Sequence, residues 1–97
     1  SNLKVFIAQL GDMAKRKSLV LFEELRKHGI NARASFGRDS IKSQLRIANR
    51  LGIKYTLIMG QKEALDGTII LREMDSGVQE TISMNKVIEI IRQKTRG

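Results

Sequence analysis

The chain has 97 residues, which is enough for one domain and too few for two hydrophobic cores. It contains no cysteine and one histidine, which excludes disulfides, thiol chemistry and zinc sites built on cysteine. Its net charge is +8, and most of the positive charge falls within residues 15–50, which hold ten Lys or Arg and three acidic residues. This charge favours a polyanionic partner, either a nucleic acid or a membrane surface.

The first half of the chain alternates between predicted strands and helices. Leu3–Gln9 is a largely apolar run, typical of a strand that is buried on both faces. We expect Asp12 to cap a helix that reaches His28, where Gly29 supplies the left-handed residue that ends it. Apolar and polar residues then alternate over Ile30–Phe36, as in a half-exposed strand.

The second half begins with another helix and strand and then changes pattern. Ser40 is expected to cap a helix that ends at Gly52, and Tyr55–Met59 is the third predicted strand. Two further strands, Thr68–Glu73 and Val78–Ile82, form a predicted hairpin. A last helix follows, with its cap at residue 83 or 85 (Ser or Asn).

The βαβαββα order predicts an α/β fold and the position of a ligand site. Two right-handed crossovers make the first three strands parallel and can place the first strand between the second and the third. Ligands of such open sheets bind outside the carboxyl ends of the strands, where the winding reverses. Three loops are expected there: Leu10–Asp12, Gly37–Ser40 and Gly60–Glu63.

No catalytic or metal site is predicted. His28 falls in the last turn of its helix, where a partial positive charge suits the helix dipole. The aspartates lie beside turns or helix starts, where local caps explain them, and no glycine-rich phosphate loop is present. A flavodoxin-like phosphoacceptor receiver would need an aspartate at the end of the third strand, where Met59 and Gly60 stand. The sequence therefore predicts a binding module without chemistry of its own.

A basic stripe is the most distinctive pattern. Arg38, Lys42, Arg46 and Arg50 recur every fourth residue from just before the second predicted helix, a spacing that places side chains on one helix face. Such a stripe can be a solvated face opposite the apolar residues. It has no acidic residues at matching spacing, which favours phosphate contacts by Lys42, Arg46 and Arg50.

Several segments resemble one known family. The opening VFIAQLG of residues 5–11, LRKHGI of residues 25–30, KSQLRIANRLG of residues 42–52 and YTLIMGQKE of residues 55–63 match its order and spacing. The segment LREMDSGVQETI of residues 71–82 looks histidyl in type. Over almost its whole length the chain is similar to the C-terminal anticodon-binding domain of class II aminoacyl-tRNA synthetases, and most similar to the histidyl type.

The resemblance implies a fold and a set of binding residues. The fold is a three-layer α/β/α sandwich with a five-stranded mixed sheet, in which the fourth strand is antiparallel to the others. Anticodon-contacting residues of the family match Arg38, Glu63 and Arg72, and Gln61 is a further candidate because its amide both donates and accepts. Arg72 lies four residues into its strand from Thr68, about 13 Å along it at ~3.3 Å per residue, and so farther from the loops.

The resemblance also implies partners and a parent protein. The expected partner is the anticodon loop of histidine tRNA, without DNA or membrane binding. The parent would be a cytoplasmic, homodimeric histidine–tRNA ligase whose catalytic domain uses ATP and Mg²⁺. No cofactor is expected in this domain. The alternatives are a synthetase-like regulatory domain that senses tRNA and an anticodon domain of threonyl or prolyl type.

Two positions depart from the histidyl pattern, which often has a proline at Gln9 and an acid at Gln61. Both changes are expected to leave the fold intact, and the second is expected to alter base reading. The domain is predicted to span residues 3–97, with Ser1 and Asn2 left over from the removal of a tag.

Overall fold

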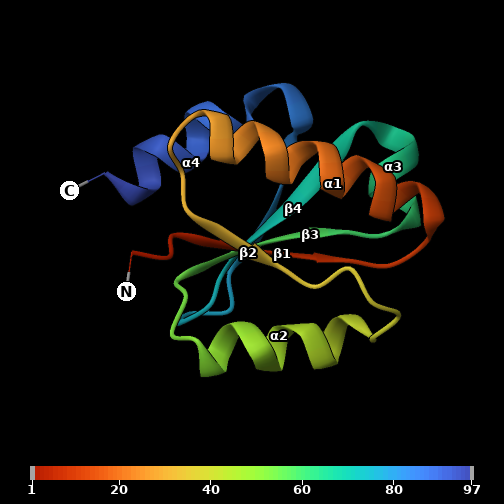
Figure 1. Ribbon diagram of the computed structural model, residues 1–97, viewed down its shortest axis with the longest axis horizontal. Coiled ribbons are helices and arrows are strands. Elements are labelled where there is room, and N and C mark those ends of the chain that lie inside the picture. Colours follow the sequence, from red (N-terminus) through yellow and green to blue (C-terminus); the bar gives the residue numbers. More distant parts are fainter. Residues whose placement is uncertain (1, 97) are drawn as a thin grey trace.

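A five-stranded mixed sheet runs through the middle of the molecule (Figure 1). The structure is a computed structural model that describes residues 2–96, so Ser1 and Gly97, at the ends of the expected tag remnant and domain, lie outside it. The strands are β1 (Val5–Gln9), β2 (Ala32–Ala34), β3 (Tyr55–Met59), β4 (Thr68–Glu73) and β5 (Gln79–Ser83). Their order is β2-β1-β3-β4-β5, with β4 antiparallel to both neighbours. The predicted position of β1 between β2 and β3 is confirmed.

Helices cover both faces of the sheet. They are α1 (Asp12–Lys27), α2 (Ile41–Arg50), α3 (Gln61–Asp66) and α4 (Val87–Thr95). Figure 1 shows α1, α3 and α4 on one side of the sheet and α2 alone on the other. The α/β/α layering that the resemblance implied is therefore confirmed.

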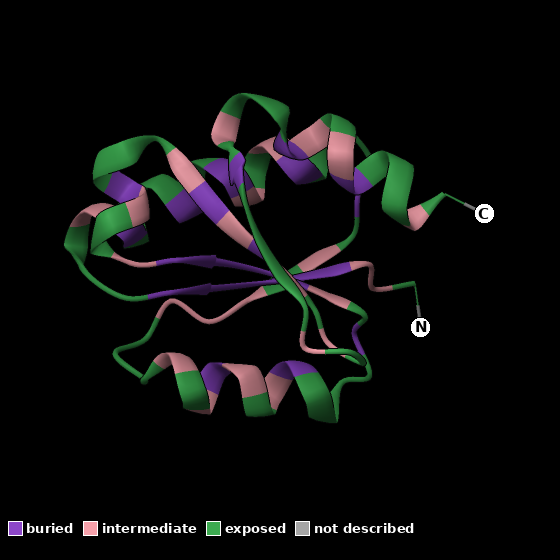
Figure 2. Cartoon of the chain, turned by 180° about the vertical axis from the view of Figure 1, so that it is seen from behind, coloured by how far each residue is buried: buried purple, intermediate pink, exposed green. Residues whose placement is uncertain are grey.

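The core has two parts, one on each side of the sheet. Alternate residues of β1 face opposite sides: Ile7 packs under α1, α3 and α4, and Phe6 packs against α2. All five residues of β1 are buried, as the apolar run predicted. Figure 2 shows the same division, with buried residues along the central strands and on the side of α2 that faces them. Burial of each large apolar side chain contributes about 1.5–3 kcal/mol.

The helix and strand ends differ in places from the sequence prediction. Asp12 is not the cap of α1: Gly11 occupies that position with φ 110°, and no side chain caps the helix. Asp12 instead lies in the first turn, where its negative charge suits the helix dipole. Ser40 caps α2 as predicted, because its side chain accepts a hydrogen bond from the Ser43 N–H at 3.1 Å. Gly29 has the expected left-handed conformation, with φ 74°.

One strand is shorter than the sequence predicts, and one helix was not predicted. The strand predicted over Ile30–Phe36 is reduced to the three residues of β2. The short helix α3, which was not predicted, follows β3 directly. Ser83 caps a single 3₁₀ turn over Met84–Lys86, and α4 continues from that turn.

The helices of residues 2–96 are all too short or too polar to span a lipid bilayer. The longest, α1, has 16 residues and carries many charges.

Candidate nucleic-acid interface

Two loops and the first turn of α3 lie at the carboxyl ends of β1, β2 and β3, at the right of Figure 1, since the loop predicted over Gly60–Glu63 is helical from Gln61 onward. The turn after β1 is tied to β3, since the N–H of Leu10 donates to the carbonyl of Met59 at 3.0 Å. The Gln61 side chain lies across this turn: its Oε1 would be 2.9 Å from a Cβ placed on Gly11. Because Gly11 also has a positive φ, a larger residue there would be strained and would displace Gln61. Glycine thus permits the close approach of the turn after β1 to the start of α3.

Glu63 caps the helix on which it lies. Its Oε1 accepts a hydrogen bond from the backbone N–H of Gly60 at 2.8 Å, which is the reciprocal half of a capping box. The side chain is partly exposed, and no other hydrogen bond or ion pair involves it within residues 2–96. Its second carboxylate oxygen therefore has no protein partner in this part of the chain. The carboxylate can stabilise α3 and accept a hydrogen bond from a ligand at the same time.

The other charges of α3 neutralise each other. Lys62 and Asp66 form an exposed ion pair at 3.0 Å. The hydrogen bond to Asp66, and then the charge of Asp66, raise the pKa of Lys62 above its ordinary value. Glu63 is thus the acidic residue of α3 that has no ion-pair partner among the described residues.

Arg38 lies in the exposed loop between β2 and α2. Among residues 2–96 its guanidinium has no hydrogen-bond or ion-pair partner. The backbone of this loop, in contrast, is hydrogen-bonded to two buried glutamines, Gln9 and Gln44, which sequence reasoning did not identify as part of the site. Within the loop, the Ser35 hydroxyl donates a weak hydrogen bond to Asp39 Oδ2 at 3.5 Å.

The basic stripe lies on the exposed face of α2. Lys42, Arg46 and Arg50 are all exposed, and none forms an ion pair with the rest of the described chain. The opposite face of α2 carries Gln44 and Ala48, which are buried against the sheet. The three stripe residues on α2 therefore face solvent without an ion-pair partner among residues 2–96, a pattern suited to phosphate, whereas Arg38 lies on the loop before the helix.

Arg72 lies apart from the loops. It pairs with Thr56 near the start of β3, and Thr56 lies four residues before Gly60. It shares the α2 side of the sheet with Ile70, two residues earlier on β4. Its Nη1 donates to Gln79 Oε1 on β5 at 3.0 Å, and its buried Nε has no partner within residues 2–96. The larger separation expected from the strand length is confirmed.

His28 has a structural role. It is the C-terminal cap residue of α1, and its Nδ1 donates to the carbonyl of Glu24 at 2.8 Å. The same carbonyl also accepts from the backbone N–H of His28 at 3.1 Å, so the side chain adds a second hydrogen bond at the end of the helix. The described residues contain no group of three His, Cys, Asp or Glu side chains that could coordinate a metal ion.

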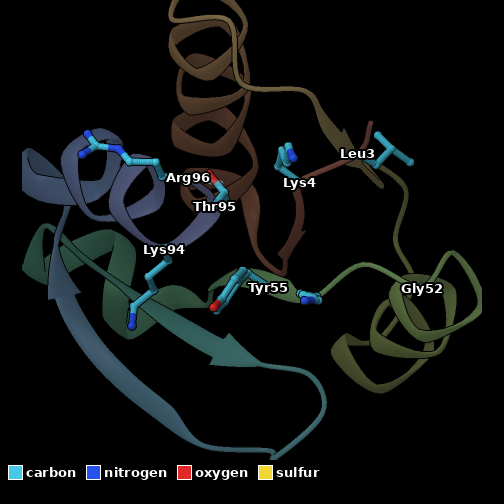
Figure 3. A pocket seen from close by; sticks show the side chains of 8 residues that line it. Leu3, Lys4, Gly52, Tyr55, Lys94, Thr95 and Arg96 are labelled. Atoms are coloured by element: carbon cyan, nitrogen blue, oxygen red, sulfur yellow. The ribbon is translucent and has the colours of Figure 1, made fainter. Parts of the chain in front are cut away.

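A second concentration of basic residues lies at the far end of the sheet. A shallow pocket of about 340 Å³ there is lined by Tyr55 and by four cations, Lys4, Lys54, Lys94 and Arg96. Figure 3 shows Lys94 beside Tyr55, with Arg96 extending away from both. This pocket opens beside the first residues of β1 and β3, so it is separate from the loops at their carboxyl ends.

Comparison with known proteins gives one consistent result. A model of the family described as "Anticodon binding domain" matches residues 4–94. The chain is 36% identical over 88 residues to a histidine–tRNA ligase of Streptomyces coelicolor and 37% identical over 93 residues to that of Syntrophotalea carbinolica. These matches cover 91% and 96% of this chain but 21% and 22% of the relatives, so the chain spans about a fifth of their length.

Solved structures show the same fold. The apo histidyl-tRNA synthetase of Staphylococcus aureus aligns with a TM-score of 0.84 at 36% identity, over 93% of this chain and 26% of that one. The RNA-binding domain of threonyl-tRNA synthetase from Cryptosporidium parvum aligns with a TM-score of 0.87 over 96% of this chain and 24% of that one. It is 20% identical, so this likeness concerns the fold alone. The curated relatives thus favour the histidyl type over the threonyl, prolyl and regulatory alternatives. The chain belongs to the anticodon-binding domain family, as a homologue of the domains found in histidyl-tRNA synthetases.

Proposed function

We propose that this domain binds the anticodon loop of histidine tRNA and contributes no catalytic residue to the reaction of its parent enzyme. The observation that carries the proposal is the placement of Arg38, on the loop before α2, and of Gln61 and Glu63, in the first turn of α3, at the same end of the sheet, together with family membership. These three residues supply one cation, one amide and one carboxylate, which suits the mixed donors and acceptors of base edges.

Each candidate residue has a distinct part in this proposal. Glu63 accepts from a base amino group, Gln61 donates and accepts, and Arg38 binds phosphate or a base acceptor. Arg72 contacts a different nucleotide, because it lies near the start of β3 on the α2 side of the sheet. Lys42 and the two arginines of α2 contact phosphates.

The proposed parent is a cytoplasmic, homodimeric histidine–tRNA ligase. Its catalytic domain would bind histidine, ATP and Mg²⁺ and would be the second partner of this domain. The proposal rests on the curated relatives, which are histidine–tRNA ligases about five times as long as the matched segment.

The proposal is tested by binding of the isolated domain to the anticodon stem-loop of histidine tRNA. Binding through one basic module should be weak, with a Kd of about 10⁻⁴ to 10⁻⁶ M, and should weaken steeply as salt increases. A stem-loop of the same length with an altered anticodon should bind more weakly. Equal affinity for both RNAs over the whole salt range would contradict anticodon recognition by this domain.

Neutralising Arg46 and Arg50 together, as Arg46→Gln with Arg50→Gln, should flatten the plot of log K against log salt concentration. Each lost phosphate contact removes about 0.7 to 0.9 from the slope, so the expected change is at most about two units. The measurement is a salt titration of stem-loop binding.

The matched control neutralises Lys94 and Arg96, which are exposed and line the pocket at the opposite end of the sheet from the proposed interface. It removes the same charge and should leave the slope nearly unchanged. If both double variants flatten the slope equally, net charge alone drives binding and the stripe is only a solvated face.

A further inference from the structure

Two buried glutamine side chains connect the end of β1 to the start of α2. Gln9 is 2% exposed and Gln44 is fully buried, although each carries an amide that is costly to remove from water without partners. The Gln44 amide brackets the backbone of Gln9: its Oε1 accepts from the Gln9 N–H at 3.0 Å, and its Nε2 donates to the Gln9 carbonyl at 2.8 Å. Both polar groups of the Gln9 backbone are therefore satisfied by one side chain.

The early end of β2 explains why this bracket is needed. The pairing of β1 with β2 ends at Ile7 and Ala34, whereas β1 continues to Gln9 beside β3. Past Ala34 the backbone groups of β1 on this side have no strand partner, and buried backbone groups must be paired. The amide of Gln44 takes the place of the missing strand.

The same two side chains also bind the loop that carries Arg38. Gln9 Nε2 donates to the carbonyl of Ser35 at 3.0 Å and, more weakly, to that of Gly37 at 3.4 Å. Gln44 Nε2 donates to the carbonyl of Asp39 at 2.8 Å. Three alternate carbonyls of the loop are thus fixed to the sheet, and Arg38 lies between two of the fixed residues.

We propose that Gln9 and Gln44 are positioning residues for RNA recognition, which fix the loop of residues 35–40 so that Arg38 meets the RNA in one arrangement. This inference rests on the proposed function of the same surface. Neither glutamine touches RNA in this proposal, because both are buried. They order the loop before RNA binds, so the loop loses less conformational entropy on binding.

The test is a double-variant cycle for binding of the histidine anticodon stem-loop, measured well below the melting temperature of every variant. Gln9→Met removes the bonds to Ser35 and Gly37 and keeps the backbone bonded to Gln44. We expect it to weaken binding by about 5- to 30-fold, the equivalent of releasing about one ordered residue. In an Arg38→Ala background, Gln9→Met should weaken binding by less than about twofold, because the group that it positions is gone.

Gln44→Met gives a second cycle with Arg38→Ala. It removes the bond to the Asp39 carbonyl and also leaves the N–H and the carbonyl of Gln9 without their side-chain partner. A control for general destabilisation is Ile91→Val, which removes a buried methylene from α4 on the other side of the sheet. The control should lower the melting temperature and leave RNA affinity unchanged.

The outcomes separate this inference from the proposed function. Loss of affinity that disappears in the Arg38→Ala background supports positioning. Equal loss in both backgrounds, or a lower melting temperature with unchanged affinity, would overturn it and leave the glutamines purely structural. If the wild-type domain does not distinguish the cognate stem-loop from the altered one, the proposed function fails first.

Discussion

Phe6→Ala is expected to lower the free energy of unfolding by about 3–5 kcal/mol, the largest stability effect among the changes considered. Phe6 is 1% exposed and is the largest side chain of the buried cluster between the sheet and α2. The other buried members of that cluster are Ala8, Ala48, Ile53 and Ile58. They cannot fill the space that the ring leaves, so a cavity remains under α2.

The functional consequence follows from the layering. Within residues 2–96, α2 is the only helix on its side of the sheet, and it carries Lys42, Arg46 and Arg50. A domain of this size is stable by about 5–15 kcal/mol, so the variant would keep little reserve. Urea unfolding followed by circular dichroism measures the loss, and the melting temperature should fall by at least about 12 °C.

Phe22→Ala is the matched control because it removes the same atoms at a half-buried position. Phe22 packs edge-on against Phe36 with ring centroids 6.0 Å apart, and part of its surface already contacts water. Its loss should therefore cost clearly less than the loss of Phe6. A larger effect at Phe22 would mean that the cluster under α2 contributes little to the stability of the domain.

The sequence predicts the order of most strands and helices, because apolar residues recur at different spacings in strands and in helices. The apolar run of β1 and the spaced apolar residues of α1 identify those elements without any tertiary information. The hairpin and the register of β4 also place Arg72 away from the loops, as the structure shows. The short helix α3 was missed because six residues are too few to establish a helical period.

The parts that the sequence did not predict depend on contacts between distant residues. Gln9 and Gln44 are 35 positions apart, and a glutamine in an apolar run or a helix carries no local sign of burial. Asp12 was wrongly expected to cap α1 because aspartate favours that position, whereas the backbone turn at Gly11 takes it. The end of β2 at Ala34 also depends on a distant segment, because Ala34 is the last residue of β2 that pairs with β1.

Glu63→Gln should weaken discrimination between cognate and altered anticodons by about 1 to 3 kcal/mol, or roughly 5- to 150-fold in kcat/KM. The Gln carbonyl oxygen can still accept from the Gly60 N–H, so the cap of α3 is retained. The amide nitrogen then replaces the second carboxylate oxygen. A donor would face the base amino group that the carboxylate is proposed to accept from, and that hydrogen bond is lost.

Glu63→Ala separates the two roles because it removes the cap as well. It should destabilise the domain by about 0.5 to 2 kcal/mol, whereas Glu63→Gln should leave stability nearly unchanged. Discrimination is measured as charging of anticodon-swapped tRNA by a parent synthetase that carries each change, and stability is measured by unfolding of the domain. If Glu63→Gln discriminates as well as the wild type and only Glu63→Ala lowers stability, Glu63 is a helix cap and the bases are read by other residues.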